Sequence, residues 1–172
     1  MFSTNMTNKK ILDRDTLAIE VHRRQAAGEH AVFTNGCFDL LHLGHVCYLQ
    51  EARSLGDFLI LGLNSDEGVR LLKGEGRPLV LEDERAKILA ALMCIDYVTI
   101  FPEPTAGPLV AVLQPSIYVK GGDYAGSEND TPDLDRLPEA KVVQQYGGHV
   151  RLISYLPHHS TTELIATIKR LP

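Results

Sequence analysis

The chain has 172 residues, a length that one domain commonly organises around a single core. Apolar residues make up 44% and charged residues 23%, which is ordinary for a folded domain and argues against a disordered tail. Lys and Arg number 17 against 22 Asp and Glu, so the net charge of −5 excludes the broad basic field of a general nucleic-acid binder. We therefore expect no nucleic-acid partner.

Neither a disulfide framework nor a membrane span is indicated. The three cysteines are scattered and odd in number, and the first ten residues lack the apolar core of a signal peptide. The longest uninterrupted apolar stretch, 88–95, is far shorter than the ~20 residues that a membrane span requires. We expect a cytoplasmic protein with reduced thiols and no membrane contact.

The first half of the chain alternates helical and strand patterns. An opening helix is predicted over about residues 15–28, with Asp15 as its cap and Gly28 at its end. Further elements are predicted in the order strand 30–34, helix 45–55, strand 58–63, helix 65–72, basic Gly-rich loop 73–78 and helix 81–93.

The second half repeats this alternation, with one interruption. The polar stretch of about 123–138 is long enough to be an insertion or lid. Around it we predict strand 97–101, helix 106–113, strand 116–120, helix 139–146, strand 149–154 and a serine-capped helix over 160–171. Five strands that alternate with helices predict an α/β fold, a doubly wound five-stranded parallel sheet forming a single domain over 1–172.

In such sheets, ligands bind beyond the carboxyl ends of the strands. The segment that follows the first predicted strand carries His42 and His45, three residues apart at the start of a helix, so both imidazoles lie on one face of its first turn. The free N–H groups and the positive dipole end of a helix suit phosphate oxygens. Gly44 between the histidines allows a ligand to approach the backbone closely.

Other interpretations of this pair stay open. One histidine can cap the helix while the other is solvated, or the pair can bind zinc with Cys37, although no fourth ligand is evident. The P-loop pattern GxxxxGK[ST] and the hydrolase pattern GxSxG are absent, and GEGRPL is an incomplete GxGxxG outside a strand–helix turn. A P-loop enzyme, a nicotinamide enzyme and a serine hydrolase are therefore disfavoured.

Further phosphate-binding candidates follow other predicted strands. Lys120 ends an apolar strand, where its ammonium faces the crevice and needs an anion. Each remaining candidate also has a structural explanation as a cap, a turn or a solvated charge; these are Lys73, Arg77, Arg85, Asp123, Ser160, Thr161 and Thr162. Together they place several cations and two helix N-termini at one edge of the sheet, which fits a triphosphate.

These motifs carry a resemblance. TNGCFDLLHLGH (34–45) and HSTT (159–162) are similar to the HxGH and STT signatures of the nucleotidyltransferase superfamily, whose Rossmann-like fold they imply. The resemblance extends over residues 10–171 to the bacterial D-glycero-β-D-manno-heptose 1-phosphate adenylyltransferases. It is carried by LGDFLILGLNSDEGVRLLKGEGRPLVLEDERAKILAAL, DYVTIF, PSIYVKGGDY and STTELI.

The resemblance implies a role for each matching residue. Catalytic roles fall on His42, His45, Lys73 and Lys120. Nucleotide contacts fall on Thr34, Asn35, Gly36, Cys37, Phe38, Gly44, Arg85, Gly121, Ser160, Thr161 and Thr162. Contacts to the second substrate fall on Asp39, Lys73, Arg77, Gly122 and Asp123. No protein metal ligand is predicted; Mg²⁺ is expected as cofactor, bridging the phosphates and held mostly by nucleotide and water, with Asp39 nearest to it.

The chain also departs from its relatives. Tyr155 stands where related glycerol-phosphate cytidylyltransferases have an arginine, in RTxGxSTT. The stretch AGSENDTPDLDRLP is longer than the equivalent connection of the heptose enzymes. Many relatives carry a sugar kinase domain on the same chain, so we expect a separate kinase to make the substrate here.

The implied reaction is transfer of AMP from ATP to a sugar 1-phosphate, which gives an ADP-sugar and pyrophosphate. The nucleophile is already anionic, so catalysis consists of positioning and charge stabilisation. The alternatives are a cytidylyltransferase acting on glycerol 3-phosphate or another polyol or sugar phosphate, and a non-catalytic nucleotide-binding module. The resemblance also implies a homodimer or higher homo-oligomer.

Overall fold

A computed structural model describes residues 5–121, 137–154, 156 and 159–171. Its centre is a five-stranded sheet in the order β3-β2-β1-β4-β5, and every pairing in it is parallel. The strands are β1 (Ala31–Gly36), β2 (Phe58–Asn64), β3 (Tyr97–Phe101), β4 (Ile117–Gly121) and β5 (His149–Ile153). The chain builds outward from β1 to β3 and then returns to add β4 and β5, so the predicted doubly wound sheet is confirmed.

Helices connect the strands and are α1 (Asn5–Asn8), α2 (Arg14–Ala26), α3 (Leu43–Ser54), α4 (Asp66–Lys73), α5 (Glu82–Ala90), α6 (Gly107–Leu113), α7 (Pro138–Gln145) and α8 (Thr161–Ile168). The predicted cap of the first long helix is wrong, because Asp13 rather than Asp15 accepts from the Thr16 N–H at 2.9 Å. Helix α5 ends earlier than predicted, since Lys10 Nζ donates to the carbonyls of Leu92 and Ile95 and holds a turn there.

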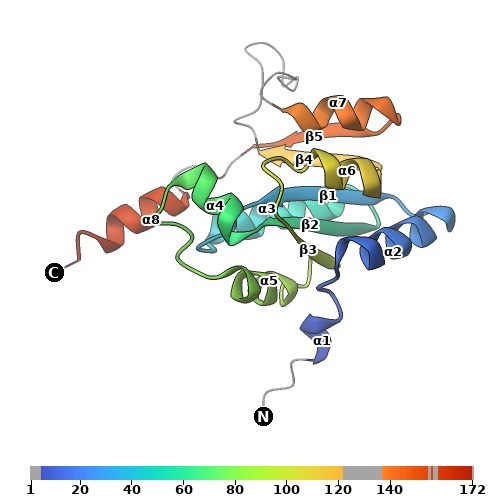
Figure 1. Ribbon diagram of the computed structural model, residues 1–172. Helices are drawn as coiled ribbons and strands as arrows, with labels where there is room; N and C mark the ends of the chain where they lie inside the picture. Colours follow the sequence, from blue (N-terminus) through green and yellow to red (C-terminus); the bar gives the residue numbers. More distant parts are fainter. Residues whose placement is uncertain (1–4, 122–136, 155, 157–158, 172) are drawn as a thin grey trace.

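Two cores lie on opposite faces of the sheet (Figure 1). Helices α2, α6 and α7 pack on one face, where Leu17, Val110 and Val143 meet Phe33 of β1. Helices α3 and α5 cover the other face. Val32 points there, one residue before Phe33, because successive strand residues face opposite sides. Strands buried on both faces therefore read as continuous apolar runs.

The structure describes only the last two residues of the predicted insertion of about 123–138. Residues 122–136 lie outside the described residues. At its end the prediction is wrong, because Leu137 is 1% exposed and belongs to the core, and Pro138 already opens α7. Proline suits that first helical position, where its missing N–H has no intrahelical partner to lose.

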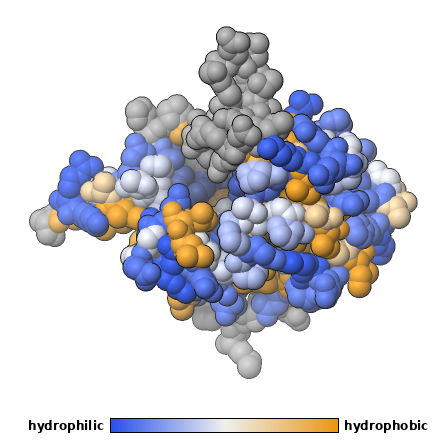
Figure 2. All heavy atoms as spheres, turned by 45° about the horizontal axis from the view of Figure 1, so that its top comes forward, coloured by the Kyte–Doolittle hydropathy of each residue, from blue (hydrophilic) through white to orange (hydrophobic). Residues whose placement is uncertain are grey.

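Helix α8 projects beyond the edge of the sheet and buries none of its residues (Figure 1). Hydrophilic residues dominate the face seen in Figure 2, and the projecting α8 shows both hydrophilic and apolar residues there. Its N-terminus is joined to the body by Thr161, whose hydroxyl donates to the Leu40 carbonyl at 3.4 Å. Within the described ranges, the longest apolar helices fall short of crossing a membrane.

Candidate functional site

The two predicted histidines meet at the N-terminus of α3. His42 is the N-cap and His45 lies in the first turn, with their rings stacked at a centroid distance of 3.8 Å and an angle of 25°. The His42 side chain makes no capping hydrogen bond. The His45 N–H donates to the His42 carbonyl at 2.9 Å, so the positive end of the helix dipole is what this first turn offers to an anion beside the rings.

The electrostatics of the pair favour neutral rings. Burial, and then the neighbouring His42, lower the pKa of His45 to about 4. Burial and His159 lower the pKa of His42, while Glu163 acts in the opposite direction. Within the described part of the chain, Nδ1 of each ring is buried and has no hydrogen-bond partner. Buried polar atoms are rarely left without a partner, so these two nitrogens mark the histidine pair as a candidate binding site.

Glycines allow this close packing. A Cβ on Gly44 would lie 3.0 Å from His42 Nδ1 and 3.1 Å from the His159 Cβ. A Cβ on Gly36 would lie 2.9 Å from Cε2 of Phe38, whose backbone has a positive φ of 44°. The Phe38 ring in turn lies 5.1 Å from His45. The segment between β1 and α3 is thus folded tightly against the histidine pair.

Lys120 approaches the same edge from β4. Its Nζ donates to the Asn35 carbonyl at 3.2 Å, and the Tyr118 hydroxyl donates to Asn35 Oδ1 at 2.8 Å. Burial lowers the pKa of Lys120, while Glu139 and Cys37 raise it. An ammonium that is poorly solvated gains more from a bound anion than an exposed one does.

The pKa of the Cys37 thiol shows that several cations lie near this atom. Burial raises its pKa, and Lys73, Arg85, Lys120 and Arg77 each oppose that rise. Four predicted cations, from the 73–80 segment, α5 and β4, therefore act on one atom just beyond β1. This agrees with the predicted convergence of positive charge at the carboxyl edge of the sheet.

Arg85 lies inside the protein, with an exposed fraction of 1%. Its guanidinium donates to the carbonyls of Val80, Cys37 and Asn64 at 2.9, 2.7 and 3.0 Å and to Asp66 Oδ1 at 2.6 Å. These bonds tie the segments after β1 and β2 to α5. The structure thus gives Arg85 a positioning role, whereas direct nucleotide contact was the expectation.

Asp39 is also engaged within the protein. Its carboxylate accepts from Arg77 and from the N–H groups of Leu79 and Val80, the last at 3.0 Å. Burial raises the pKa of Asp39, but these hydrogen bonds outweigh it and lower the pKa overall. Asp39 therefore fixes the 73–80 segment, and its predicted substrate contact stays a prediction.

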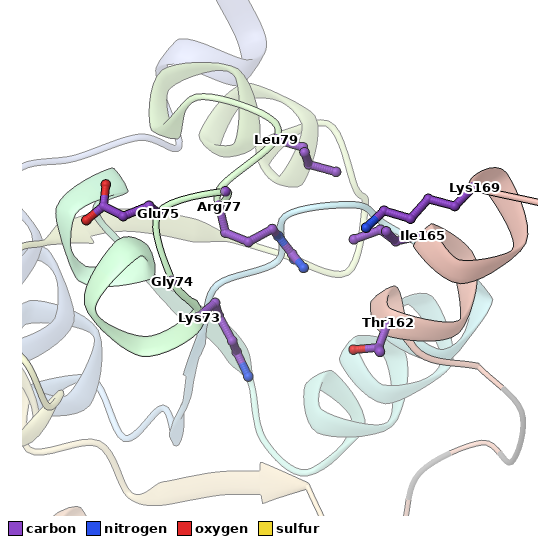
Figure 3. A pocket seen from close by; sticks show the side chains of 9 residues that line it. Lys73, Gly74, Glu75, Arg77, Leu79, Thr162, Ile165 and Lys169 are labelled. Carbon is purple, nitrogen blue, oxygen red and sulfur yellow. The ribbon is translucent and has the colours of Figure 1, made fainter.

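The serine–threonine motif begins α8. Ser160 Oγ accepts from the Glu163 N–H at 3.1 Å and donates to Glu163 Oε2 at 3.0 Å. Thr161 contacts Leu40, as described above, and Thr162 faces a groove lined also by Lys73 and Arg77 (Figure 3). The predicted cap is confirmed, and the motif lies beside the α3 histidines through the contact of His159 with Gly44.

Two other residues escaped the sequence prediction. Tyr48 of α3 bonds the Thr34 hydroxyl at 2.7 Å and donates to the Val119 carbonyl at 3.2 Å, so Thr34 is engaged between β1 and α3. Glu163 brings a carboxylate close to His42. The one sequence signal for a role of Glu163 was its position three residues after Ser160, the spacing of a helix-capping pair. Strand β4 ends at Gly121, one residue beyond the predicted end at Lys120, while Gly122, Asp123 and Tyr155 lie outside the described residues.

Fold and site together define a doubly wound α/β protein in which helix N-termini, stacked imidazoles and several cations meet at the carboxyl edge of the sheet. The sequence matches the cytidylyltransferase-like family over residues 33–167. The chain belongs to the cytidylyltransferase-like family.

Curated relatives support this assignment. The chain is 54% identical over 162 residues to the bifunctional protein HldE of Pelobacter propionicus and 52% identical over 159 residues to that of Geobacter sulfurreducens. These matches cover 94% and 92% of the chain, which spans 32% and 31% of those relatives. The chain thus corresponds to about a third of each of those proteins.

A solved structure has the same fold. The lipopolysaccharide core biosynthesis protein from Thermoplasma volcanium superposes with a TM-score of 0.56 and 25% identity. The match covers 77% of this chain and 100% of that one. The Rossmann-like arrangement expected from the sequence is therefore confirmed.

Proposed function

We propose that this chain transfers AMP from ATP to the phosphate of a sugar 1-phosphate, D-glycero-β-D-manno-heptose 1-phosphate in particular, and releases pyrophosphate. The observation that carries the proposal is the histidine pair. Two stacked, partly buried imidazoles at a helix N-terminus, each with a buried Nδ1 atom that lacks a partner within the described residues, suit a phosphate chain better than a structural cap. Relatives that are 54% and 52% identical support the same class of reaction.

In the proposed reaction an oxygen of the acceptor phosphate attacks the α-phosphorus of ATP. The bond from that phosphorus to the bridging oxygen breaks, and its electron pair leaves with pyrophosphate. The attacking oxygen is already anionic, so no general base is required. His42, His45 and Lys120 would stabilise the charge that develops on the phosphate oxygens.

Each group has a distinct part in this scheme. The first-turn N–H groups of α3 would orient the phosphates, and Lys120 would supply a fixed positive charge from β4. Arg85 and Asp39 hold the surrounding segments in place. No group on the protein needs to form a covalent intermediate.

Mg²⁺ is the expected cofactor, but the described residues do not form a site for it. Within residues 5–121, 137–154, 156 and 159–171, no cluster of three or more His, Cys, Asp or Glu is placed to hold a metal ion. Asp39, the nearest candidate, is engaged with Arg77 and two backbone N–H groups. We propose that Mg²⁺ enters bound to the nucleotide phosphates, and we assign it no step on the protein.

The test is pyrophosphate release by purified protein with Mg²⁺, with ATP and CTP each crossed with the heptose 1-phosphate, other sugar 1-phosphates and glycerol 3-phosphate. We expect turnover with ATP and the heptose 1-phosphate, and a loss of about 10²–10³ in rate for His45→Ala. His22→Ala is the matched control, since His22 is exposed on α2.

Other outcomes would change the proposal in specific ways. Turnover with CTP or glycerol 3-phosphate would favour a cytidylyltransferase with the same mechanism, as the name of the family suggests. Nucleotide binding without turnover for every pair would favour a binding module. Equal rates for His45→Ala and His22→Ala would contradict the role of the histidine pair.

A further inference from the structure

Glu139 is a buried carboxylate that the proposed reaction does not use. It lies in the first turn of α7 and is 5% exposed. Its Oε1 accepts from the Ala106 N–H at 2.9 Å, at the start of α6. Within the described ranges, Glu139 takes part in no direct salt bridge. Its hydrogen bond therefore accounts for an acceptor at this position but not for a negative charge.

A neutral side chain can make the same hydrogen bond. The Ala106 N–H needs one acceptor, and the amide oxygen of glutamine offers one on a side chain of the same length. Burying a carboxylate instead costs free energy, and a positive charge nearby offsets that cost. The dipole of a helix stabilises a carboxylate in its first turn even when that carboxylate is exposed, so the dipole does not explain why Glu139 is buried.

The fold brings the cation Lys120 to the face of the sheet on which α7 lies. Successive residues of a strand point to opposite faces. In β4, Tyr118 packs in the core beneath α6 and α7, whereas Val119 packs in the core on the other face. Lys120 therefore shares the face of Tyr118. Helix α7 packs on this face through Ala140, the residue that follows Glu139.

Neutral groups of β1 orient the Lys120 ammonium. Thr34 pairs with Val119 in the sheet, so the residues that follow them, Asn35 and Lys120, lie beside each other. Lys120 Nζ donates to the Asn35 carbonyl at 3.2 Å, and the Tyr118 hydroxyl donates to Asn35 Oδ1 at 2.8 Å. These hydrogen bonds fix the direction of the ammonium, but they carry no charge that compensates it.

Glu139 supplies the compensating charge. Burial lowers the pKa of Lys120; among the described residues, Glu139 on α7 and Cys37 after β1 oppose this effect, Glu139 more strongly. Burial raises the pKa of the Cys37 thiol, which is therefore neutral at pH 7. Tyr118, the other titratable group on this face of β4, donates its hydroxyl to Asn35. The carboxylate of Glu139 is thus the anion that acts on Lys120 from the helices on this face.

We propose that Glu139 is a positioning residue for Lys120, whose buried ammonium its carboxylate compensates while its hydrogen bond to Ala106 holds α6 and α7 together beside the site. This role rests on the proposed function, in which Lys120 stabilises phosphate charge. A buried amine without a counter-charge loses its proton more readily. With Glu139 in place, Lys120 is already an ammonium before the nucleotide arrives. Glu139 acts through Lys120 and is not itself a catalytic residue.

The experiment is a pH titration of the full chain without nucleotide, in which NMR follows the Cε resonances of isotope-labelled lysines. The Lys120 resonance is the one that disappears in Lys120→Gln. We expect Glu139→Gln to lower the titration midpoint of Lys120 by roughly one pH unit, the low end of the effect of a nearby opposite charge. Glu51→Gln is the matched control, since it removes an exposed carboxylate on α3 and should leave the midpoint unchanged.

Two substitutions separate the charge of Glu139 from its hydrogen bond. Glu139→Gln keeps an acceptor for the Ala106 N–H and removes the charge, whereas Glu139→Asp keeps the charge on a side chain one carbon shorter. We expect the midpoint of Lys120 to fall in Glu139→Gln and to stay nearer the wild-type value in Glu139→Asp. Far-UV circular dichroism checks that both variants fold. A larger fall in Glu139→Asp, or equal midpoints in Glu139→Gln and Glu51→Gln, would overturn the proposal and leave Glu139 a structural acceptor for α6.

ATP binding measured by calorimetry distinguishes this inference from the proposed function. The lysine titration needs no nucleotide, so it decides the role of Glu139 whether or not the chain transfers AMP. In Glu139→Gln, the pH above which ATP affinity falls should move down by the same amount as the Lys120 midpoint. Equal ATP Kd values for the wild type and Lys120→Gln would instead contradict the part of Lys120 in the proposed function.

Discussion

Arg85 offers the sharpest test of how the site is held together. Its guanidinium bridges three carbonyls and the Asp66 carboxylate from a position that is 1% exposed. Arg85→Lys keeps the charge but removes the planar fork. A lysine ammonium has three donors on a flexible stem and cannot meet these four acceptors in the same geometry.

The expected cost follows from those acceptors. Each buried acceptor left without a partner costs about 1–3 kcal/mol, and breaking a buried ion pair costs about 3–5 kcal/mol. Lysine recovers part of this loss by reaching one or two acceptors. We expect the free energy of unfolding to fall by about 3 kcal/mol, a large part of the roughly 5–15 kcal/mol that stabilises a typical domain.

Urea unfolding followed by circular dichroism measures this change. Lys87→Gln is the matched control, because Lys87 is an exposed cation on the same helix α5 and its loss should cost no more than about 0.5 kcal/mol. A decrease below about 1 kcal/mol for Arg85→Lys, with an unchanged m-value, would refute the positioning role. Arg85 would then be free to contact the nucleotide, as the sequence suggested.

Two further predictions concern the histidine pair. Nucleotide binding at pH 7 should take up protons, because the pKa of His45 in the free protein is about 4 and phosphate charge raises it. Affinity should rise as the pH falls toward about 4. Calorimetry in buffers of different ionisation enthalpy measures the uptake, which should diminish in His45→Ala; equal uptake would contradict this. Gly44→Ala should destabilise the protein by about 1–3 kcal/mol, because the added Cβ meets His42 and His159. In urea unfolding, Gly107→Ala is the control, since its Cβ would make only ordinary contacts.

The fold was accessible from sequence because its signals are local. The apolar run of β2, continuous from Phe58 to Leu63, indicates a strand buried on both faces, and alternation with helices then determines a parallel sheet. The errors lie where distant contacts decide. Helix α5 ends early because Lys10, far along the chain, bonds the turn that follows it. Pattern reasoning carries no information about such a contact.

The site was predictable to a different degree. The spacing of His42 and His45 was enough to place both rings on one face of a helix turn, and the structure stacks them. The partners of Asp39 and Arg85 were not predictable. Both residues sit in motifs that suggest ligand contact, yet most of their hydrogen bonds are with backbone groups that only the fold brings together. Every residue type except proline carries the same backbone N–H and carbonyl groups, so the sequence does not indicate which of them a side chain will contact.

The carboxylates near this edge of the sheet make contacts within the protein. Asp66 is paired with Arg85, Asp39 with Arg77, and Glu163 accepts from Ser160. Glu139, the carboxylate that raises the pKa of Lys120, accepts from the Ala106 N–H. Two of the cations beyond β1, Arg77 and Arg85, are thus paired within the protein, whereas Lys73 forms no salt bridge to another described residue. In the proposed function, a phosphate chain would bring negative charge to the cations that these carboxylates do not pair.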